Sequence, residues 1–312
     1  MQDFFNNKSI FNEALKWAVA EENSVEVVIK REDLLHPEVS GNKFRKLKYN
    51  LLKAKADGYN TLLTFGGAFS NHLAATAAAG FLFGFKTIGV IRGDELAFDF
   101  AQTLGQNPTL RLAHHYGMQF KFVSRTLYRL KNSANFSANL HTEFGTFYEL
   151  PEGGTNDLAI KGCEEILKPQ DDAFDYICLA VGTGGTISGI INASQKHQKV
   201  LGFPALKGNF LTSEIKNMIK PKVNWQLIND YNFGGYAKVS KELITFINEF
   251  KTETNIPLDA VYTGKMMFGL ADLIRKGSFK KGSKILVIHT GGLQGNNGMN
   301  VFLKKKYNIE IR

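Results

Sequence analysis

The chain has 312 residues, of which 44% are hydrophobic, and it carries a formal net charge of +9. No apolar run approaches the ~18 residues that a membrane-spanning helix needs, so membrane insertion is not expected. The basic residues are scattered rather than gathered in one block, which argues against nucleic-acid binding. The N-terminus lacks the pattern of a secretory signal, and the two cysteines form no CxxC pair. These features predict a protein of the reducing cytoplasm.

Hydrophobic patterning predicts strands and helices that alternate along the chain. Strands are predicted at 24–30, 59–65, 85–91, 119–123, 146–150, 176–181, 199–203, 224–228 and 284–289. Helices are predicted at 44–58, 70–80, 109–117, 157–167, 187–197, 238–251 and 264–276. Such alternation builds a mostly parallel sheet with right-handed crossovers, so the fold class is α/β.

Three predicted strands end in glycine-containing turns, at 65–72, 181–186 and 289–292. Ligands of open parallel sheets bind beyond the carboxyl ends of the strands. A helix that starts at such a turn presents unpaired N–H groups at the positive end of its dipole, so each turn can hold an anion. The middle turn lacks the lysine of a P-loop, and Ile187 occupies the third glycine position of a dinucleotide motif. A single phosphate is therefore favoured over a nucleotide, with a purely structural turn as the alternative.

A fourth glycine turn, at Gly41, precedes Lys43, Arg45 and Lys46 at the start of a predicted helix. Cations there oppose the helix dipole at a cost of ~0.3–1 kcal/mol for each exposed charge, so something should offset them. A lysine held in a Schiff base has no free ammonium, and a phosphate would neutralise its neighbours. The pattern suggests a phosphorylated cofactor bound to Lys43, and a solvated basic face is the alternative.

Other polar residues have simpler explanations. Ser70 is a favoured residue type for a helix N-cap. His289 ends an apolar strand and is expected to be a core histidine, and Cys178 lies inside an apolar run. Adjacent His114 and His115 cannot point the same way from a helix, so no metal site is predicted.

Five short motifs follow one another along nearly the whole chain: GNKFRKL at 41–47, SNH at 70–72, EGGTN at 152–156, VYTGK at 261–265 and HTGG at 289–292. Together they resemble the family of D-cysteine desulfhydrase and 1-aminocyclopropane-1-carboxylate (ACC) deaminase. The first motif is specific, whereas the glycine loops alone are not. The resemblance implies a homodimeric enzyme that uses pyridoxal 5′-phosphate (PLP), acts on a small amino acid and has the tryptophan synthase β-like fold. It further implies a cofactor cleft between a large PLP-binding domain, 1–43 and 151–312, and a small α/β domain, 44–150.

The resemblance also implies roles for the residues that would hold the cofactor. Lys43 would be the Schiff-base lysine, and Asn71 would meet the phenolate oxygen. The phosphate would be bound by Lys46 with the glycine loop, namely Gly182, Thr183, Gly184, Gly185 and Thr186.

On the substrate side, the resemblance implies that Ser70, Asn71 and His72 receive the carboxylate. Tyr236 and Tyr262 resemble the family's two active-site tyrosines. The group that removes the α-proton is left open between Ser70, the two tyrosines and Lys43. A hydroxyl in this role would need a pKa lowered by nearby cations.

Two departures from the deaminase pattern bear on the reaction. ACC deaminases carry a glutamate after the second tyrosine, where it can keep the pyridine nitrogen protonated, and an apolar residue in the last motif. Here Thr263 and Thr290 occupy these positions. A hydroxyl partner leaves the ring a weaker electron sink, which suits β-elimination better than opening a cyclopropane. The sequence therefore favours desulfhydrase over deaminase.

A further departure concerns the substrate pocket. Both activities usually place Tyr-Gly-Val/Leu-Pro at the first tyrosine, whereas this chain has Tyr236-Ala237-Lys238-Val239. The loop that shapes the substrate pocket therefore differs, so a carbon–sulfur lyase acting on D-cysteine is favoured within the family, and a different small amino acid stays open as the substrate. ACC deamination is the alternative within the family, and a non-catalytic basic binding protein is the alternative from another class.

Overall fold

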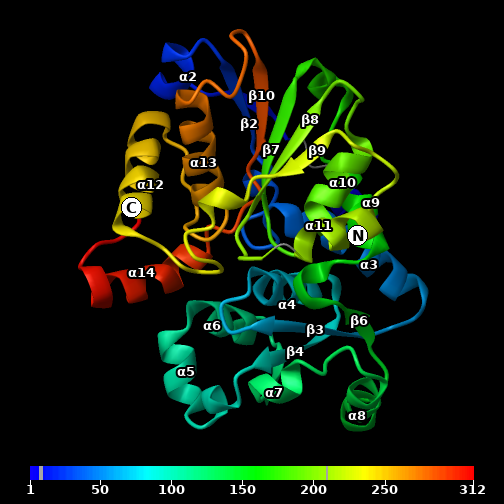
Figure 1. The fold of residues 1–312 in the computed structure, drawn as a ribbon. Helices are drawn as coiled ribbons and strands as arrows, with labels where there is room; N and C mark the ends of the chain where they lie inside the picture. Colours follow the sequence, from blue (N-terminus) through cyan, green and yellow to red (C-terminus); the bar gives the residue numbers. More distant parts are fainter. Residues whose placement is uncertain (7–9, 209) are drawn as a thin grey trace.

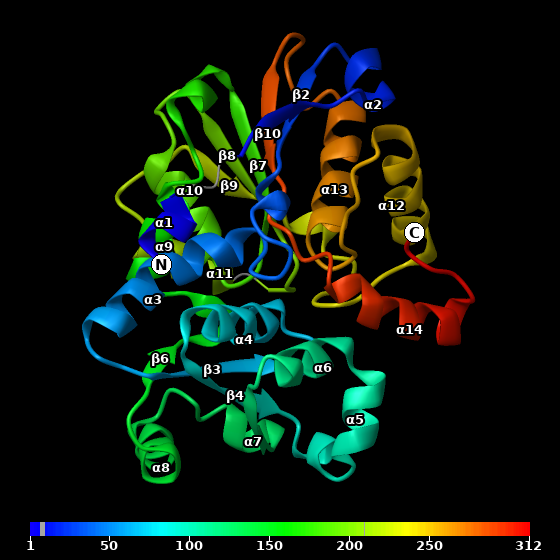
Figure 2. The same ribbon diagram turned by 180° about the vertical axis from the view of Figure 1, so that it is seen from behind.

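The computed structural model describes residues 1–6, 10–208 and 210–312, which form two bodies, each built around its own sheet. Figure 1 shows the body with the larger sheet above and the body with the smaller sheet below, and Figure 2 shows the same arrangement from behind. The predicted α/β class with two open, mostly parallel sheets is confirmed. Within the described residues, no helix is long and apolar enough to cross a membrane.

The larger sheet has six strands, and its central strands are buried. In spatial order they are β1 (Asn12–Ala14), β2 (Glu26–Lys30), β10 (Lys284–Ile288), β7 (Tyr176–Val181), β8 (Lys199–Pro204) and β9 (Trp225–Leu227). Among the strands of the described residues, only β1 runs antiparallel to its neighbour in this sheet. Val287 of β10 lies opposite Ile29 on one side and Cys178 on the other. These near-continuous apolar runs are typical of parallel strands that are covered on both faces.

Helices cover both faces of the larger sheet. One layer consists of α2 (Ala18–Glu22), α12 (Lys241–Thr254) and α13 (Thr263–Arg275), and the other of α9 (Asp157–Glu164), α10 (Gly185–Ala193) and α11 (Phe210–Met218). The C-terminal helix α14 (Gly295–Tyr307) extends from the first layer toward the smaller body, where it meets α6 (Pro108–His115).

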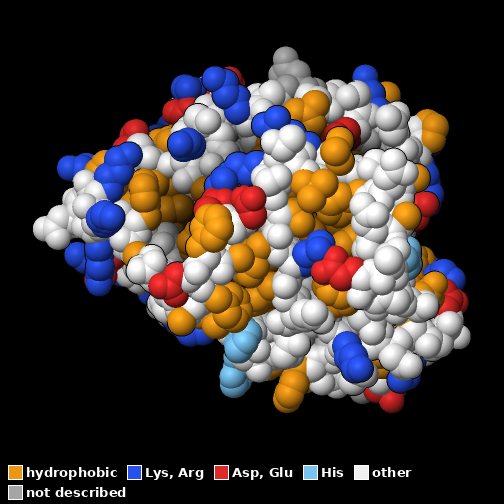
Figure 3. All heavy atoms as spheres, turned by 90° about the horizontal axis from the view of Figure 1, so that it is seen from below, with side chains coloured by type: hydrophobic (Ala, Val, Ile, Leu, Met, Phe, Trp, Pro, Cys, Tyr) orange, Lys and Arg blue, Asp and Glu red, His pale blue; other side chains and the backbone are white. Residues whose placement is uncertain are grey.

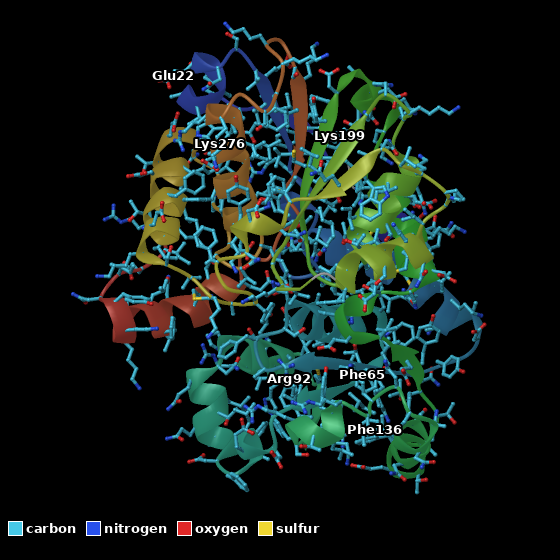
Figure 4. The ribbon with its side chains drawn as sticks, viewed as in Figure 1. Glu22, Phe65, Arg92, Phe136, Lys199 and Lys276 are labelled. Atoms are coloured by element: carbon cyan, nitrogen blue, oxygen red, sulfur yellow. The ribbon has the colours of Figure 1, made fainter. Side chains whose placement is uncertain are left out.

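The smaller sheet has four parallel strands, in the order β5 (Gln119–Val123), β4 (Lys86–Arg92), β3 (Thr61–Gly67) and β6 (Tyr148–Leu150). On one face it packs against the alanine-rich helix α4 (Asn71–Phe83), which lies between the two bodies in Figure 1. On the other face Phe65 packs with Phe136, at 6.5 Å between ring centroids, and Figure 4 labels both in the lower body. The start of α4 is therefore held at the junction of the two bodies.

The remaining helices are α1 (Gln2–Asn6), α3 (Asn42–Ala56), α5 (Phe100–Gln106), α7 (Arg125–Tyr128) and α8 (Ala134–Phe144). All predicted strands and helices form, with ends shifted by a few residues, and β1, α1, α2, α5, α7, α8, α11 and α14 were not predicted. The strands of the two sheets lie on opposite sides of the predicted domain boundaries. The exact boundaries, at 43/44 and 150/151, stay a prediction. The first of them assigns nearly all of α3 to the smaller domain, although α3 packs against α9 of the larger body.

The charges on the surface are mixed in sign. Figure 3, which views the molecule from the side of the smaller body, shows Lys and Arg side chains interspersed with Asp, Glu and hydrophobic ones. A continuous basic stripe, the usual footprint of nucleic-acid binding, is not visible on this face.

Candidate active site

The predicted site residues meet in one cleft between the two bodies, at the carboxyl ends of β3, β7 and β10. The cleft is lined by Ser40, Asn42, Lys43, Lys46, Ser70, Asn71, His72, Gly153, Ala180, Val181, Gly182, Thr183, Gly184, Thr186, Ile187, Tyr236, Tyr262, Thr290, Gly291, Gly292 and Gln294. Of the residues predicted from the sequence, only Gly185 and Thr263 do not line it. No Asp or Glu belongs to the lining that the described residues form.

The start of α3 is docked onto the turns that follow β10 and β7. Gly41 has a φ of +58°, and a Cβ at this position would lie 2.0 Å from the Thr290 carbonyl oxygen, so only glycine fits. The Asn42 N–H donates to the Thr290 carbonyl at 3.1 Å, and Asn42 Nδ2 donates to Thr186 Oγ1 at 2.9 Å. These contacts place Lys43 between the two turns.

The cations near the start of α3 fall into two groups. Arg45 donates to both carboxylate oxygens of Glu32, at 2.8 and 2.9 Å, and Lys48 pairs with Glu165 at 2.7 Å. The expectation that a phosphate neutralises the cations next to Lys43 is therefore wrong for Arg45, which a carboxylate compensates, as one also does for Lys48. Lys43 and Lys46 form no ion pair with any described residue, and both line the cleft.

Lys46 joins two glycine loops. Its ammonium donates to the Gly153 carbonyl and Thr155 Oγ1, each at 2.9 Å, and lies 3.4 Å from Thr183 Oγ1. Burial lowers the pKa of Lys46 to about 8. Because the unpaired N–H groups at the start of α10 lie beside this amine, the corner is suited to an anion.

Lys43 lines the same cleft, with Nζ 3.3 Å from Asn42 Oδ1. Burial and the neighbouring charge of Lys46 lower the pKa of Lys43 to about 7. A large share of this amine is therefore neutral near pH 7, which is the form that attacks a carbonyl group.

Ser70, Asn71 and His72 bring the first turn of α4 to the opposite wall of the cleft. Ser70 is at the N-cap position, but its side chain makes no capping hydrogen bond with the described residues, so simple capping does not explain it. His72 is 1% exposed, and burial, with Lys43 and Lys46 nearby, lowers its pKa well below the ordinary value. The imidazole is thus neutral.

Several buried polar atoms here lack a partner. Neither ring nitrogen of His72 nor Oδ1 of Asn71 has a hydrogen-bond partner among the described residues. Buried polar groups are almost always satisfied, so these atoms indicate a missing polar ligand. Together with the amines of Lys43 and Lys46, which have no carboxylate partner among the described residues, they fit a ligand that carries a phosphate, a carbonyl carbon and a carboxylate, as PLP with an amino acid would.

Tyr236 and Tyr262 form the third wall, with ring centroids 6.2 Å apart and an interplanar angle of 65°. Burial raises the pKa of both phenols above the ordinary value, and the shift is larger for Tyr262. A phenol that acts as a base would need a lowered pKa. The nearby cations do not bring the pKa of either tyrosine below its ordinary value in the protein without a ligand.

Thr263 faces away from the cleft and binds Asp259. Its hydroxyl donates to Asp259 Oδ1 at 2.8 Å, and the Asp259 carboxylate also accepts from the backbone N–H groups of Val261, Tyr262 and Thr263. This helix cap was missed in the sequence, because Asp259 precedes α13 by four residues. In contrast, Thr290 lines the cleft at the end of β10.

We expect Asp259→Ala to lower the unfolding free energy by about 2 kcal/mol or more, because it leaves several buried N–H groups without an acceptor. A fall of several degrees in the melting temperature would register this loss. The exposed Asp230→Ala is the control and should melt like the wild type. Equal melting temperatures for all three proteins would contradict the capping role.

Residues outside the cleft match the simpler explanations given for them. His289 is fully buried, with Nε2 2.8 Å from the Pro257 carbonyl oxygen and Nδ1 accepting from the Gly291 N–H, as expected of a core histidine. Cys178 is buried in the larger sheet.

The sequence analysis did not assign Asn42, Gly153, Thr155 and Gln294 to the site, although the motifs at 41–47 and 152–156 contain the first three.

Comparison with known proteins identifies the family of the chain. Residues 15–291 match the sequence profile described as "Pyridoxal-phosphate dependent enzyme". A Pyrococcus horikoshii protein provisionally named 1-aminocyclopropane-1-carboxylate deaminase is 32% identical, over 89% of this chain and 87% of its own length. An Arabidopsis thaliana protein named bifunctional D-cysteine desulfhydrase/ACC deaminase is also 32% identical, over 88% of this chain and 74% of its own length. A crystal structure described as an ACC deaminase homologue superposes with a TM-score of 0.79 at 30% identity, covering 92% of this chain and 90% of that one. The chain belongs to the family of pyridoxal-phosphate dependent enzymes.

Proposed function

We propose that the protein is a PLP-dependent lyase that eliminates sulfide from D-cysteine. D-cysteine and water would give pyruvate, ammonia and hydrogen sulfide. The Arabidopsis relative carries both this activity and ACC deamination in its name. The observation that favours elimination for this chain is the absence of any Asp or Glu from the lining that the described residues form. Family membership sets aside the alternative of a non-catalytic binding protein.

The residues of the cleft suit the separate functional groups of PLP. Lys43 would hold the aldehyde carbon covalently, Lys46 and the turn from Gly182 to Thr186 would hold the phosphate, and Thr290 would lie at the pyridine nitrogen. Asn71 would contact the phenolate oxygen, whereas Thr263, which binds Asp259 and does not line the cleft, would not touch the ring. When bound to the substrate amine, PLP withdraws electrons from Cα and so makes loss of the α-proton possible.

The start of α4 would orient the substrate. Its N–H groups and the side chains of Ser70, Asn71 and neutral His72 can donate to a carboxylate, and the helix dipole adds to the attraction. The unpartnered ring nitrogens of His72 support this role. A carboxylate held here fixes the Cα–H bond relative to Lys43 across the cleft.

Lys43 is the favoured group to remove the α-proton. Its pKa of about 7 makes the free amine available near neutral pH, whereas the raised pKa values of Tyr236 and Tyr262 disfavour their phenolate forms. Ser70 has no basic partner in the described structure that would activate its hydroxyl. The two tyrosines would instead shape the pocket and donate hydrogen bonds to the leaving group.

Reaction choice follows from the partner of the pyridine nitrogen. The hydroxyl of Thr290, which we assign to this position, does not keep the pyridine nitrogen protonated, so the ring accepts less negative charge. The Asp259 carboxylate is not available to hold a proton on the pyridine nitrogen, because it already accepts from the Thr263 hydroxyl and from three backbone N–H groups. Loss of a β-thiol needs less stabilisation of the carbanion than opening a cyclopropane does. ACC deamination to 2-oxobutyrate and ammonia remains the second candidate, because relatives bear that name.

Side-by-side turnover tests this choice. We expect the purified enzyme to release pyruvate and sulfide from D-cysteine at least ten times faster than it releases 2-oxobutyrate from ACC. L-cysteine serves as the control for stereochemistry. Faster release of 2-oxobutyrate would refute the elimination proposal, and turnover of neither would indicate that the altered Tyr236 loop selects another amino acid.

We further propose a homodimer in the cytoplasm. The homodimer comes from the family resemblance, and the location from the two cysteines, both of which are free and buried. Sedimentation equilibrium of the holoenzyme should give twice the chain mass of 34.8 kDa, and a single-chain mass would contradict the dimer.

A further inference from the structure

Tyr236 is carried into the cleft by a strained loop, residues 232–238. Phe233 and Ala237 adopt left-handed backbone conformations, with φ values of 54° each, and Gly234 and Gly235 between them also have positive φ. This conformation is unfavourable for residues other than glycine. Such strain persists only where surrounding contacts fix the backbone, so this loop needs an anchor.

The anchor that the structure contains is Lys265, a buried lysine on α13. It is 2% exposed, and its ammonium donates to the carbonyl of Asn232 at 2.8 Å and to that of Gly235 at 2.7 Å. The same two carbonyls close the turns inside the loop, because they accept from the N–H groups of Gly235 and Lys238. One ammonium therefore holds both turns of the strained segment.

We propose that Lys265 is a positioning residue that fixes Tyr236 in the cleft. The proposal extends the proposed function, since it presumes that Tyr236 acts on the substrate. Another side chain of α13 contacts this loop, because Phe268 packs on Phe233 at 5.1 Å between ring centroids, and Asp272 accepts from the hydroxyl of Tyr231, just before the loop, at 2.6 Å.

The second cleft tyrosine depends on the same helix. Tyr262 is the N-cap residue of α13, whose first N–H groups are bound by Asp259. With Lys265 in place, one helix sets the positions of both phenols, which lie against each other in the cleft. Lys265 itself does not line the cleft, so it reaches the substrate only through Tyr236.

Hydrogen exchange of the holoenzyme tests the anchoring without any substrate. Lys265→Met keeps the length of the side chain and removes its donors, so amides of 232–238 should exchange about ten- to hundredfold faster, while β7 and β10 keep their protection. Lys265→Arg, which retains donors, should restore part of the protection. The exposed Lys280→Met is the matched control. If Lys265→Met does not fold, Lys265→Leu, which also lacks donors, carries the same test. Unchanged exchange in 232–238 would overturn the proposal.

A double-mutant cycle then tests whether Lys265 acts through Tyr236. Lys265→Met should lower kcat/KM about tenfold in the wild-type background and leave it nearly unchanged in a Tyr236→Phe background, while PLP absorbance is retained in both. Equal losses in the two backgrounds would contradict the positioning role. If the enzyme turns over neither D-cysteine nor ACC, the proposed function fails, whereas the exchange result still decides the anchoring.

Discussion

Lys43→Ala is expected to abolish turnover, by on the order of 10³-fold or more, and to remove the visible absorption of the PLP-bound protein. The amine is the only group in the cleft formed by the described residues that combines a pKa near 7 with a position between the phosphate turn and the start of α4. Absorption spectra and turnover measured on the same preparation check both parts of this expectation.

The same variant should fold normally. Burial makes protonation of Lys43 less favourable in the folded chain than in the unfolded chain, so its removal costs the apoprotein no stability below the ordinary lysine pKa. Lys53→Ala is the matched control, because Lys53 is on the same helix but is exposed and paired with Asp57. An unchanged spectrum in Lys43→Ala would refute the assignment of Lys43 as the PLP-binding residue. Loss of the visible absorption in Lys53→Ala would show that any damage to α3 has the same effect.

Gly185→Val is expected to weaken PLP binding by about 100-fold, with a much smaller effect on stability. Gly185 lies behind the lining of the cleft, where a Cβ would stand 2.9 Å from Thr155 Oγ1 and 3.2 Å from the Lys46 Nζ. A valine would push away the amine and hydroxyl that we assign to the phosphate corner. Titration of the apoprotein with PLP, followed by absorbance, measures the change.

Gly105→Val provides the control for this prediction. Gly105 is a helical residue of α5, and a Cβ at this position would meet open space, so its replacement changes backbone propensity without displacing neighbours. It should leave PLP affinity unchanged. Wild-type affinity in Gly185→Val would show that the turn from Gly182 to Thr186 serves the fold alone.

The sequence predicted the elements that carry the site because their signals are local. The apolar runs of β7 and β10 and the glycines that follow them lie within a few residues of each other. Four of the missed helices lack such signals: α1, α2 and α7 have five residues or fewer, and α14 begins with Gly295, Asn296, Asn297 and Gly298, which are poor helix formers.

Contacts between distant residues could not be predicted in this way. Glu165, which compensates Lys48, is 117 residues away in the chain. The partner of Arg45, Glu32, approaches it through the turn before α3. Thr263 was expected to face the cofactor because of its place after Tyr262, but its hydroxyl is turned to Asp259. Local pattern places a residue on an element, whereas tertiary packing decides which way its side chain points.

We propose that PLP is bound covalently to Lys43 in the cleft between the two bodies. Borohydride reduction of the purified holoenzyme, followed by digestion and mass spectrometry, tests it most directly. The visible absorption should disappear, and a single peptide, the one that contains Lys43, should gain the mass of the reduced cofactor. An adduct on another lysine, such as Lys46 or Lys265, or no adduct in a protein that contains PLP, would show that Lys43 does not bind the cofactor covalently.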